Sequence, residues 1–134
     1  MSLDILLVED ADVLSRRMAQ AIDTLDGVRV VACVATQAEA VQAVALSAPD
    51  VMVLDLSLAD GSGFRVLRQL DHRRDPRVVV FTNHPGEILR RRALELGAEG
   101  FFDKSDGIEP LLDWLCSERD RRRSAMGLGP GAEE

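Results

Sequence analysis

The feature that most constrains this chain of 134 residues is a series of short apolar runs separated by stretches of helical periodicity. The runs occupy residues 4–8, 28–34, 51–54, 77–81 and 100–103. They are short for buried helices and apolar at successive positions, which is typical of strands that are buried on both faces. Five strands of this type predict the interior sheet of one globular domain.

The stretches between the runs carry apolar residues at intervals of three and four, which predicts helices that each bury one face. These helices are expected at residues 12–25, 36–47, 64–70 and 87–96, with a fifth near the C-terminus. Strict alternation of strand and helix requires parallel strands, right-handed crossovers and helices on both faces of the sheet. The predicted fold class is therefore α/β, with a doubly wound five-stranded parallel sheet.

The last predicted helix opens with a cap pattern, Asp106-x-x-Glu109, and has Pro110 in its first turn, where proline is tolerated. Further on, the chain becomes charged and then rich in glycine and proline. We therefore predict one folded domain over residues 1–118 and a partly disordered C-terminal tail over residues 119–134. The arginines between positions 119 and 123 are interpreted as a solvated helix face.

Composition and charge exclude several classes of function. The net charge is −7 and the isoelectric point is near 4.8, which argues against nucleic-acid binding through a broad basic surface. No stretch approaches about 18 uninterrupted apolar residues, so no membrane span is predicted. No signal peptide is visible, and a cytoplasmic location is expected. Cys33 and Cys116 lack the spacing of a metal site or a disulfide framework and are expected to be buried free thiols.

Four of the apolar runs end on polar residues of different kinds. These are three acids, one hydroxyl and one ammonium: Glu9, Asp10, Asp55, Thr82 and Lys104. Lys104 is the only lysine in the chain, against fifteen arginines. The carboxyl ends of parallel strands meet at one edge of the sheet, where ligands of such folds bind, so we expect these side chains to lie together. No comparable grouping is expected at the amino ends, which carry Asp4, Arg29 and Asp50.

The three acids at these strand ends indicate a site for a divalent cation. Magnesium prefers oxygen ligands in near-octahedral geometry and uses one or two carboxylates together with water and phosphate oxygens. Asp10 and Asp55 can supply the two carboxylates, and Glu9 can reach the ion directly or through water. Three carboxylates crowded together without a cation repel one another. A metal ion is therefore expected.

The same set of residues suits phosphoryl transfer, which depends on positioning and on neutralisation of charge. An ionised carboxylate such as Asp55 can act as a nucleophile and form an aspartyl phosphate. Lys104 and Thr82 can contact the phosphoryl oxygens that the metal leaves free. A metal-dependent phosphohydrolase on the same type of sheet is the alternative, but such enzymes commonly keep an acid two residues after the nucleophile, and this chain has Ser57 there.

Taken in order, these motifs resemble the receiver domain of bacterial two-component response regulators over residues 4–117. The match consists of Val8-Glu9-Asp10 after the first strand, Leu54-Asp55-Leu56 with Asp60-Gly61 and Gly63 after the third, Phe81-Thr82 after the fourth, and Gly100-Phe101-Phe102-x-Lys104 in the fifth. The resemblance implies a flavodoxin-like sheet with the strand order 2-1-3-4-5.

The resemblance also implies a role for each residue of the site. Asp55 would be phosphorylated by a histidine kinase or a phosphotransfer protein. Asp10, Asp55 and the backbone carbonyl of Ser57 would bind Mg²⁺, or Mn²⁺ in its place, with Glu9 helping through water. Thr82 and Lys104 would contact the phosphoryl group.

Phe101 would be the aromatic switch residue, because it lies three residues before Lys104. In such a switch Thr82 moves toward the phosphoryl group and the ring follows into the space that it leaves. The output face would consist of the fourth helix, the fifth strand and the fifth helix, with Trp114, Arg90 and Arg91 on it. The expected partners are a downstream output protein, an effector domain beyond this chain, or a second copy in a homodimer.

Several neighbours of the motif residues depart from the family pattern. Ser105 follows Lys104 where the family usually has a cis proline, and we expect this peptide bond to be trans because a non-proline cis bond costs about 2.5–4 kcal/mol. Ala59 replaces a common proline, which predicts a looser phosphoacceptor loop. Asn83 stands where a small residue is common and is expected to narrow access for small phosphoryl donors.

Ser57 and His84 occupy the two positions at which family members tune dephosphorylation, two residues after Asp55 and Thr82 respectively. A hydroxyl and an imidazole are not the best-known pair for fast hydrolysis. The hypothesis that follows is a phosphorylated state that lasts for minutes or more rather than seconds.

Overall fold

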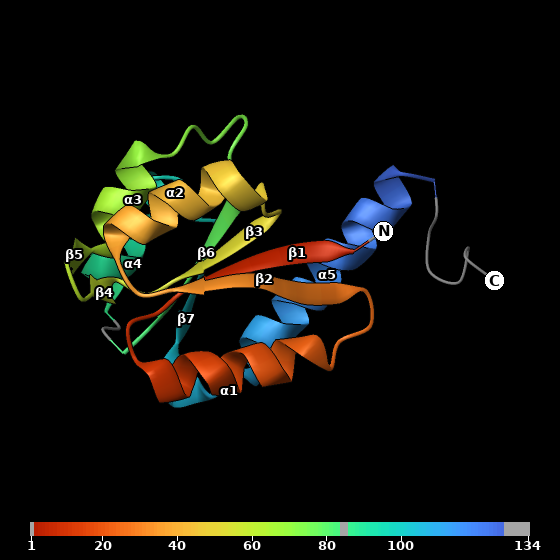
Figure 1. Cartoon of the computed structure of the whole chain (residues 1–134), viewed down its shortest axis with the longest axis horizontal. Helices are drawn as coiled ribbons and strands as arrows, with labels where there is room; N and C mark the ends of the chain where they lie inside the picture. The colour runs from red at the N-terminus through yellow and green to blue at the C-terminus, as the bar shows by residue number, and fades with distance from the viewer. Residues whose placement is uncertain (1, 84–85, 128–134) are drawn as a thin grey trace.

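The computed structural model describes residues 2–83 and 86–127. Its central sheet has five parallel strands in the order β2-β1-β3-β6-β7 (Figure 1). Their bounds are β1 (Leu3–Val8), β2 (Val28–Val34), β3 (Val51–Leu54), β6 (Arg77–Thr82) and β7 (Gly100–Asp103). This order corresponds to the predicted 2-1-3-4-5 and confirms the doubly wound α/β fold.

Within the described residues, each strand of the main sheet is followed along the chain by one of five α-helices, as predicted. They are α1 (Asp12–Asp23), α2 (Gln37–Ser47), α3 (Gly63–Gln69), α4 (Glu87–Glu95) and α5 (Glu109–Ala125). Within the described residues no helix is long and apolar enough to cross a membrane.

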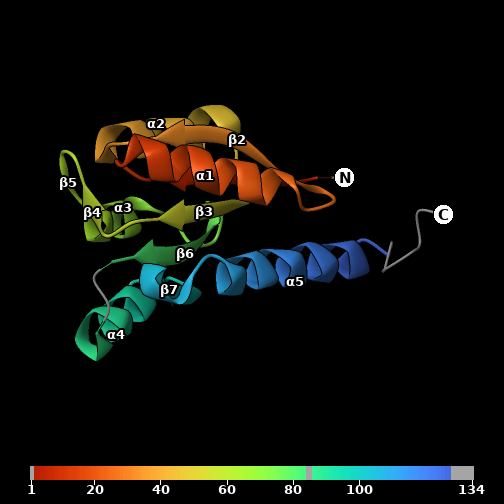
Figure 2. The ribbon, with the colours of Figure 1, turned by 90° about the horizontal axis from the view of Figure 1, so that it is seen from below.

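The three inner strands, β1, β3 and β6, are buried on both faces because helices cover both sides of the sheet. Leu6 and Leu7 are both fully buried, yet Leu6 belongs to the core under α2, α3 and α4, whereas Leu7 belongs to the core under α1 and α5. The two views in Figures 1 and 2 show these helices around the sheet. Uniformly apolar strands are therefore the correct signal for a sheet between two helical layers.

The segment between β3 and α3, predicted as a loop, contains a small hairpin. β4 (Ser57–Leu58) and β5 (Gly61–Ser62) pair in antiparallel fashion across a turn formed by Ala59 and Asp60. Leu58 is buried in the core under α2 and α3. One apolar residue therefore anchors a hairpin that is too short to give a periodic signal.

The start of α5 differs from the prediction. α5 begins at Glu109 after Ile108, with no side-chain cap, and Asp106 lies instead in a 3₁₀ turn (Lys104–Asp106). Asp103 caps this turn by accepting from Ser105 N at 2.9 Å, and Gly107, at φ +83°, separates the turn from the helix. The expected trans bond after Lys104 is confirmed, because the described residues contain no cis peptide bond.

The helix α5 continues to Ala125, so the predicted domain boundary after residue 118 falls inside it. Figure 2 shows α5 extending beyond the end of β6. Arg119, Arg122 and Arg123 of this extension are half-buried, which corrects their interpretation as a solvated face, whereas Arg121 is exposed. Arg119 donates to the Asp26 carbonyl at 2.6 Å, and Arg122 donates to Asp50 Oδ1 at 3.0 Å.

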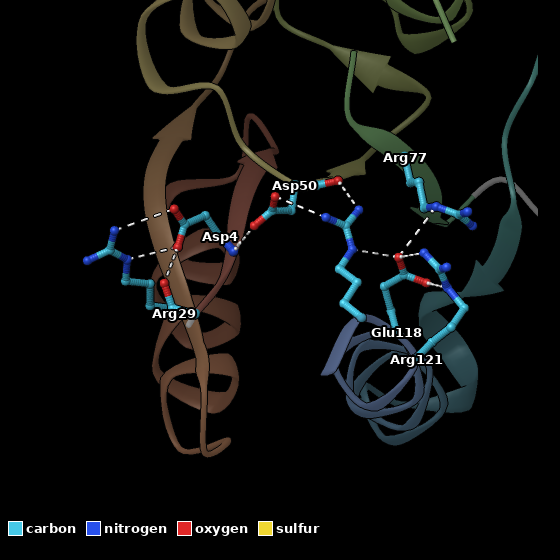
Figure 3. A network of polar contacts seen from close by, with 8 residues as sticks. Asp4, Arg29, Asp50, Arg77, Glu118 and Arg121 are labelled. Atoms are coloured by element: carbon cyan, nitrogen blue, oxygen red, sulfur yellow. Dashed lines mark hydrogen bonds and ion pairs between the residues drawn. The ribbon is translucent and has the colours of Figure 1, made fainter. Parts of the chain in front are cut away.

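The amino ends of the strands carry a connected polar network, against the prediction of no grouping (Figure 3). Asp4 in β1 accepts from Arg29 Nε at 2.9 Å, and Asp4 N donates to Asp50 Oδ2 at 2.8 Å. Glu118, almost fully buried, accepts from Arg122 Nε at 2.8 Å and from Arg121 at 2.6 Å. The network forms because the α5 extension, which the strand ends alone do not reveal, supplies its central residues.

Arg77 extends this network toward β7. Its Nε lies 3.4 Å from Glu118 Oε2, and its Nη1 donates to Glu99 at 2.6 Å. Ion pairs and hydrogen bonds therefore link residues at the amino ends of all five strands of the main sheet.

The two cysteines are free, as predicted, but they are not both buried. Cys33 is exposed and Cys116 is half-buried. Cys33 lies in β2, which is an edge strand of the sheet as far as the structure describes it and pairs with β1. An apolar run in an edge strand is less completely covered than one in the centre, which explains the error.

Candidate functional site

The strand register brings the predicted site residues to one edge of the sheet. Val8, the last residue of β1, pairs with Leu54, the last residue of β3. Thr82, the last residue of β6, pairs with Asp103, directly before Lys104. The polar residues at the ends of four strands are therefore neighbours in space, as the sequence predicted.

Glu9, Asp10 and Asp55 form a cluster of carboxylates. Each offers an oxygen that lies within 4.8 Å of the others. Glu9 and Asp55 are 4% and 6% exposed, whereas Asp10 is exposed. Like charges at this distance, two of them away from solvent, repel strongly unless a cation or a proton compensates them.

Lys104 provides part of this compensation. Its Nζ donates to Glu9 Oε1 at 2.5 Å and to Asp55 Oδ2 at 3.0 Å, and its side chain is largely buried. Burial alone would lower the pKa of Lys104, but the hydrogen bonds to Glu9 and Asp55 outweigh it, and the pKa is raised. The ammonium is therefore a fixed positive charge at neutral pH.

Glu9 responds to its surroundings in a different way. Burial raises its pKa, against the effect of the hydrogen bonds from Lys104 and from Ala11 N, which donates to Glu9 Oε2 at 3.0 Å. A carboxylate with a raised pKa gains from a further positive charge nearby. Repulsion from the Asp55 carboxylate adds to the effect of burial on the pKa of Glu9.

The carboxylate of Asp55 is held by donors on both oxygens. Oδ1 accepts from Thr82 Oγ1 at 3.0 Å and from Ser57 N at 3.3 Å, while Oδ2 accepts from Lys104. Thr82 is fully buried. Asp55 is thus oriented with a hydroxyl and an ammonium beside it, the two groups expected to contact phosphoryl oxygens.

The donor set of the cluster fits a hard divalent cation. All three side chains offer carboxylate oxygens, which Mg²⁺ prefers, and no cysteine or histidine belongs to the group within the described residues. A cleft of about 170 Å³ opens beside Glu9 and Asp10. Exposed Asp10 gives the cluster one side that water molecules and a metal ion can reach.

The remaining predicted residues lie around this centre. Phe101, in β7, is half-buried against the core under α2 to α4. Asn83 is exposed and lines, with Lys104, a hollow of about 370 Å³ between α1 and the start of α5. His84 lies outside the described residues. Its predicted part in tuning dephosphorylation stays a prediction.

The three residues predicted for a partner face are not equivalent. Arg90 and Arg91 are exposed on α4. Trp114 is half-buried and packs against the core under α1 and α5. Their use as a partner surface stays a prediction.

Sequence reasoning gave Asp60 no role beyond its place in the motif. In the structure its carboxylate accepts from Gln37 N at 2.6 Å and from Ala38 N at 3.3 Å. These are the first residues of α2, 22 and 23 positions away. The sequence shows an acid beside a glycine in this turn, but it does not show that the acid accepts hydrogen bonds, because that depends on how α2 packs.

Comparison with known proteins gives a family match over most of the chain. Residues 5–115 match the family model described as the response regulator receiver domain. The chain is 32% identical over 108 residues to the KDP operon transcriptional regulatory protein KdpE of Escherichia coli strain K12, covering 81% of this chain and 47% of that protein. It is 35% identical over 106 residues to the methanol utilization control regulatory protein MoxX of Paracoccus denitrificans, covering 76% and 47%. The chain spans about half the length of the curated relatives it matches.

Solved structures agree with the fold. A LuxR-family two-component response regulator from Aurantimonas sp. SI85-9A1 is similar with a TM-score of 0.73 and 30% identity, over 84% of this chain and 86% of that one. The response regulator domain of Thermotoga maritima CheB has a TM-score of 0.77 over 97% of this chain and 100% of that one, and its 23% identity supports the fold alone.

Proposed function

This chain belongs to the response regulator receiver domain family, and we propose that it accepts a phosphoryl group on Asp55 in a Mg²⁺-dependent reaction. The observation that carries this proposal is the position of the Asp55 carboxylate, between Lys104 and Thr82 and beside the acids Glu9 and Asp10. Asp55 is the one member of the acidic cluster that contacts both of these donors.

Mg²⁺ would be held by Asp10, Asp55 and the backbone carbonyl of Ser57, with Glu9 helping through water. When bound, the ion supplies positive charge that neutralises the carboxylates and an incoming phosphoryl group. Mn²⁺, another cation that prefers oxygen ligands, would serve in its place. The domain is not proposed to be an enzyme for external substrates, because the only chemistry needed is its own phosphorylation and dephosphorylation.

In the transfer step an Asp55 oxygen attacks the phosphorus of a phosphohistidine on the donor. The new bond joins Asp55 to phosphorus, and the phosphorus–nitrogen bond breaks as the imidazole of the donor leaves. Lys104 then exchanges its hydrogen bond with Asp55 Oδ2 for one with a phosphoryl oxygen. Thr82 Oγ1 likewise exchanges its hydrogen bond with Asp55 Oδ1 for one with a phosphoryl oxygen. Both donors therefore lie close to the incoming phosphoryl group before the reaction begins.

Thr82 is the residue that would transmit the reaction to the surface. Its hydroxyl must shift toward the phosphoryl group. Half-buried Phe101, which pairs with the residue two positions before Thr82 in β6, would then follow into the space that opens. The resulting change would reach the face of α4, β7 and α5, where we place Trp114, Arg90 and Arg91 as partner contacts. Phosphorylation would favour one conformation of this face.

The proposed phosphoryl donor is a sensor histidine kinase or a phosphotransfer protein, and the domain is placed in the cytoplasm, where those donors act. The proposed output is a downstream protein, an effector domain of the same polypeptide, or a homodimer, with no nucleic acid bound by this domain itself. The phosphohydrolase alternative gains no support from the family match. The position two residues after Asp55, where such an enzyme would have an acid, holds the exposed Ser57.

The phosphorylated state is proposed to last for minutes or more. Ser57, at one of the two tuning positions, is exposed and offers a hydroxyl rather than an acid or amide for orienting water. Release of inorganic phosphate after rapid phosphorylation measures this lifetime. Loss within seconds at neutral pH would refute it.

The test of the proposed function is incubation with Mg²⁺ and a phosphohistidine donor, followed by mass spectrometry of the trapped acyl phosphate. We expect one phosphoryl group, on Asp55, that requires Mg²⁺ and is absent from the Asp55→Asn variant. Labelling of another residue, or labelling that does not need a divalent cation, would contradict the proposal.

A further inference from the structure

The tip of the β4–β5 hairpin is attached to the N-terminus of α2 through Asp60. Its Oδ1 accepts from Gln37 N at 2.6 Å and its Oδ2 from Ala38 N at 3.3 Å. The glycine that follows, Gly61, also approaches α2 closely, since a Cβ at that position would lie 2.9 Å from Gln37 Oε1. The hairpin and the helix are therefore in direct contact at this point.

This contact completes the cap of α2. The first four N–H groups of a helix have no partner inside the helix. Thr36, the N-cap residue, caps one of them, because its Oγ1 accepts from Glu39 N at 3.1 Å. Gln37 N and Ala38 N are two more, and Asp60 accepts from both. The hydrogen bond from Gln37 N is also the main reason why the pKa of Asp60 is lowered.

The base of the same segment is fixed at the candidate metal site. Ser57 N donates to Asp55 Oδ1 at 3.3 Å, and Ser57 pairs with Ser62 across the hairpin. Gly63 N donates to Leu56 O at 3.0 Å, and a Cβ at Gly63 would lie 2.4 Å from the Asp55 carbonyl oxygen. The base contacts the candidate metal site and the tip contacts α2, so the segment that begins with Ser57 is held at both ends.

We propose that Asp60 is a positioning residue for the metal ion: by fixing the hairpin tip to α2, it holds the backbone carbonyl of Ser57 in place for Mg²⁺. This inference rests on the proposed function, in which Ser57 shares the ion with Asp10 and Asp55. Ala59, next to Asp60 in the turn, does not restrict the backbone as a proline would. The docked carboxylate of Asp60 supplies that restriction instead.

The test compares Mg²⁺ binding by the whole chain and its variants, using isothermal titration calorimetry. Asp60→Ala removes both acceptors and is expected to weaken Mg²⁺ binding by about fivefold to tenfold. Asp60→Asn keeps an acceptor oxygen and is expected to weaken it by about twofold. Saturating Mg²⁺ should return the phosphorylation rate of Asp60→Ala to within about twofold of wild type, a recovery that a general loss of folding would not allow.

Asp71→Ala is the matched control. Asp71 is also an exposed loop carboxylate that accepts a backbone N–H, from Arg73 at 3.0 Å, but it lies between α3 and β6. It should leave Mg²⁺ affinity unchanged. The inference is overturned if folded Asp60→Ala binds Mg²⁺ as wild type does, or if Asp71→Ala weakens binding equally.

A wild-type chain that binds Mg²⁺ but never carries phosphate on Asp55 would refute the proposed function instead, because the affinities of the Asp60 variants are measured without phosphorylation.

Discussion

Both ends of the parallel sheet gather charged side chains, but only one end balances them. At the carboxyl ends, the three carboxylates of the acidic cluster have the single ammonium of Lys104. At the amino ends, four carboxylates are interleaved with four arginines, namely Asp4, Asp50, Glu99 and Glu118 with Arg29, Arg77, Arg121 and Arg122. Figure 3 shows the part of this network from Arg29 to Arg77. The same kind of strand-end chemistry therefore has two different outcomes.

Charge balance, more than charge density, therefore separates a site from a structural contact in this domain. A network in which each acid has an arginine partner is satisfied by the fold itself. A cluster with excess negative charge is satisfied only when a cation arrives, and its state changes when one does. The carboxyl end can therefore respond to Mg²⁺ and phosphate, whereas the amino end has no comparable reason to respond.

The choice of cation also differs between the two ends. Arg121 donates to both oxygens of Glu118, at 3.0 and 2.6 Å, a forked geometry that fixes both partners. Lys104 is instead a point-like charge on a flexible stem, which can exchange one oxygen for another. The only lysine of the chain thus lies where a movable charge is useful.

The largest expected effect comes from removing the nucleophile at the carboxyl end. Asp55→Asn keeps the shape of the side chain but should lower the rate of phosphorylation by at least about a thousandfold. It also removes one of the crowded negative charges, so the midpoint of thermal unfolding without Mg²⁺ should not fall. Labelling with a phosphohistidine donor and calorimetric unfolding measure the two quantities. Phosphorylation at a rate near that of wild type would refute the role of Asp55.

The second largest effect is expected from a substitution that disturbs the charge balance at the amino end. Glu118→Gln leaves Arg77, Arg121 and Arg122 without their shared carboxylate, and we expect it to lower the free energy of unfolding by about 2 kcal/mol, since these arginines partly reach solvent. Urea unfolding measures this loss. The rate of phosphorylation on Asp55 should stay within about twofold of wild type.

Asp113→Asn is the control for this prediction, because Asp113 is an exposed acid on the same helix, α5. Its free energy of unfolding should change by less than about 0.5 kcal/mol. Equal destabilisation by the two variants would mean that the amino-end network adds nothing particular to stability.

A smaller effect should come from removing the ammonium at the carboxyl end. Lys104→Met deletes the cation that competes with Mg²⁺ for Glu9 and Asp55. Mg²⁺ should therefore bind more tightly, by about tenfold, even though coupling of phosphorylation to Thr82 and Phe101 is lost. Calorimetric titration measures the affinity, with Arg122→Met at the amino end as the control that leaves it unchanged. Weaker Mg²⁺ binding by Lys104→Met would contradict the charge argument.

The smallest expected effect is a dependence of stability on pH that originates at the amino end. Burial alone would raise the pKa of Glu118, but hydrogen bonds from Arg121 and Arg122 outweigh it, and the pKa is lowered. The folded state therefore holds fewer protons than the unfolded state at acid pH. The stabilisation is complete above the ordinary pKa of about 4.3 and is lost as the pH falls through the lower folded-state pKa.

Wild type should lose free energy of unfolding as the pH falls from about 5 to about 3, and Glu118→Gln should make this loss smaller by about 1 kcal/mol. Urea unfolding at several pH values, without Mg²⁺, gives the comparison with wild type. An equal loss of unfolding free energy in wild type and Glu118→Gln would show that the arginines do not hold Glu118 ionised.

The sequence was sufficient for the carboxyl end because each of its site residues directly follows, or ends, an apolar run. Parallel topology then brings Asp55, Thr82 and Lys104 together without any knowledge of side-chain packing. The amino-end network could not be predicted in this way. Its central contact joins Asp50 to Arg122, 72 residues away, on a helix extension that strand patterns do not report.

Local signals failed where tertiary contacts decided the outcome. Asp106 fits a cap pattern, but Gly107 turns the chain with a positive φ, and α5 begins only afterwards. Asp60 looks like an ordinary turn residue until α2 presents its N–H groups. Cys33 lies in an apolar run, and only the strand order reveals that β2 is an edge.

The most direct test of the account is an NMR comparison of the two ends when beryllofluoride and Mg²⁺, which mimic the phosphoryl group, are added together. We expect the backbone amides of Thr82 and Phe101 to shift in the wild-type chain, those of Asp4 and Asp50 to stay unchanged, and no shift in Asp55→Asn. The account would be contradicted if Thr82 and Phe101 did not shift, or if Asp55→Asn gave the same shifts.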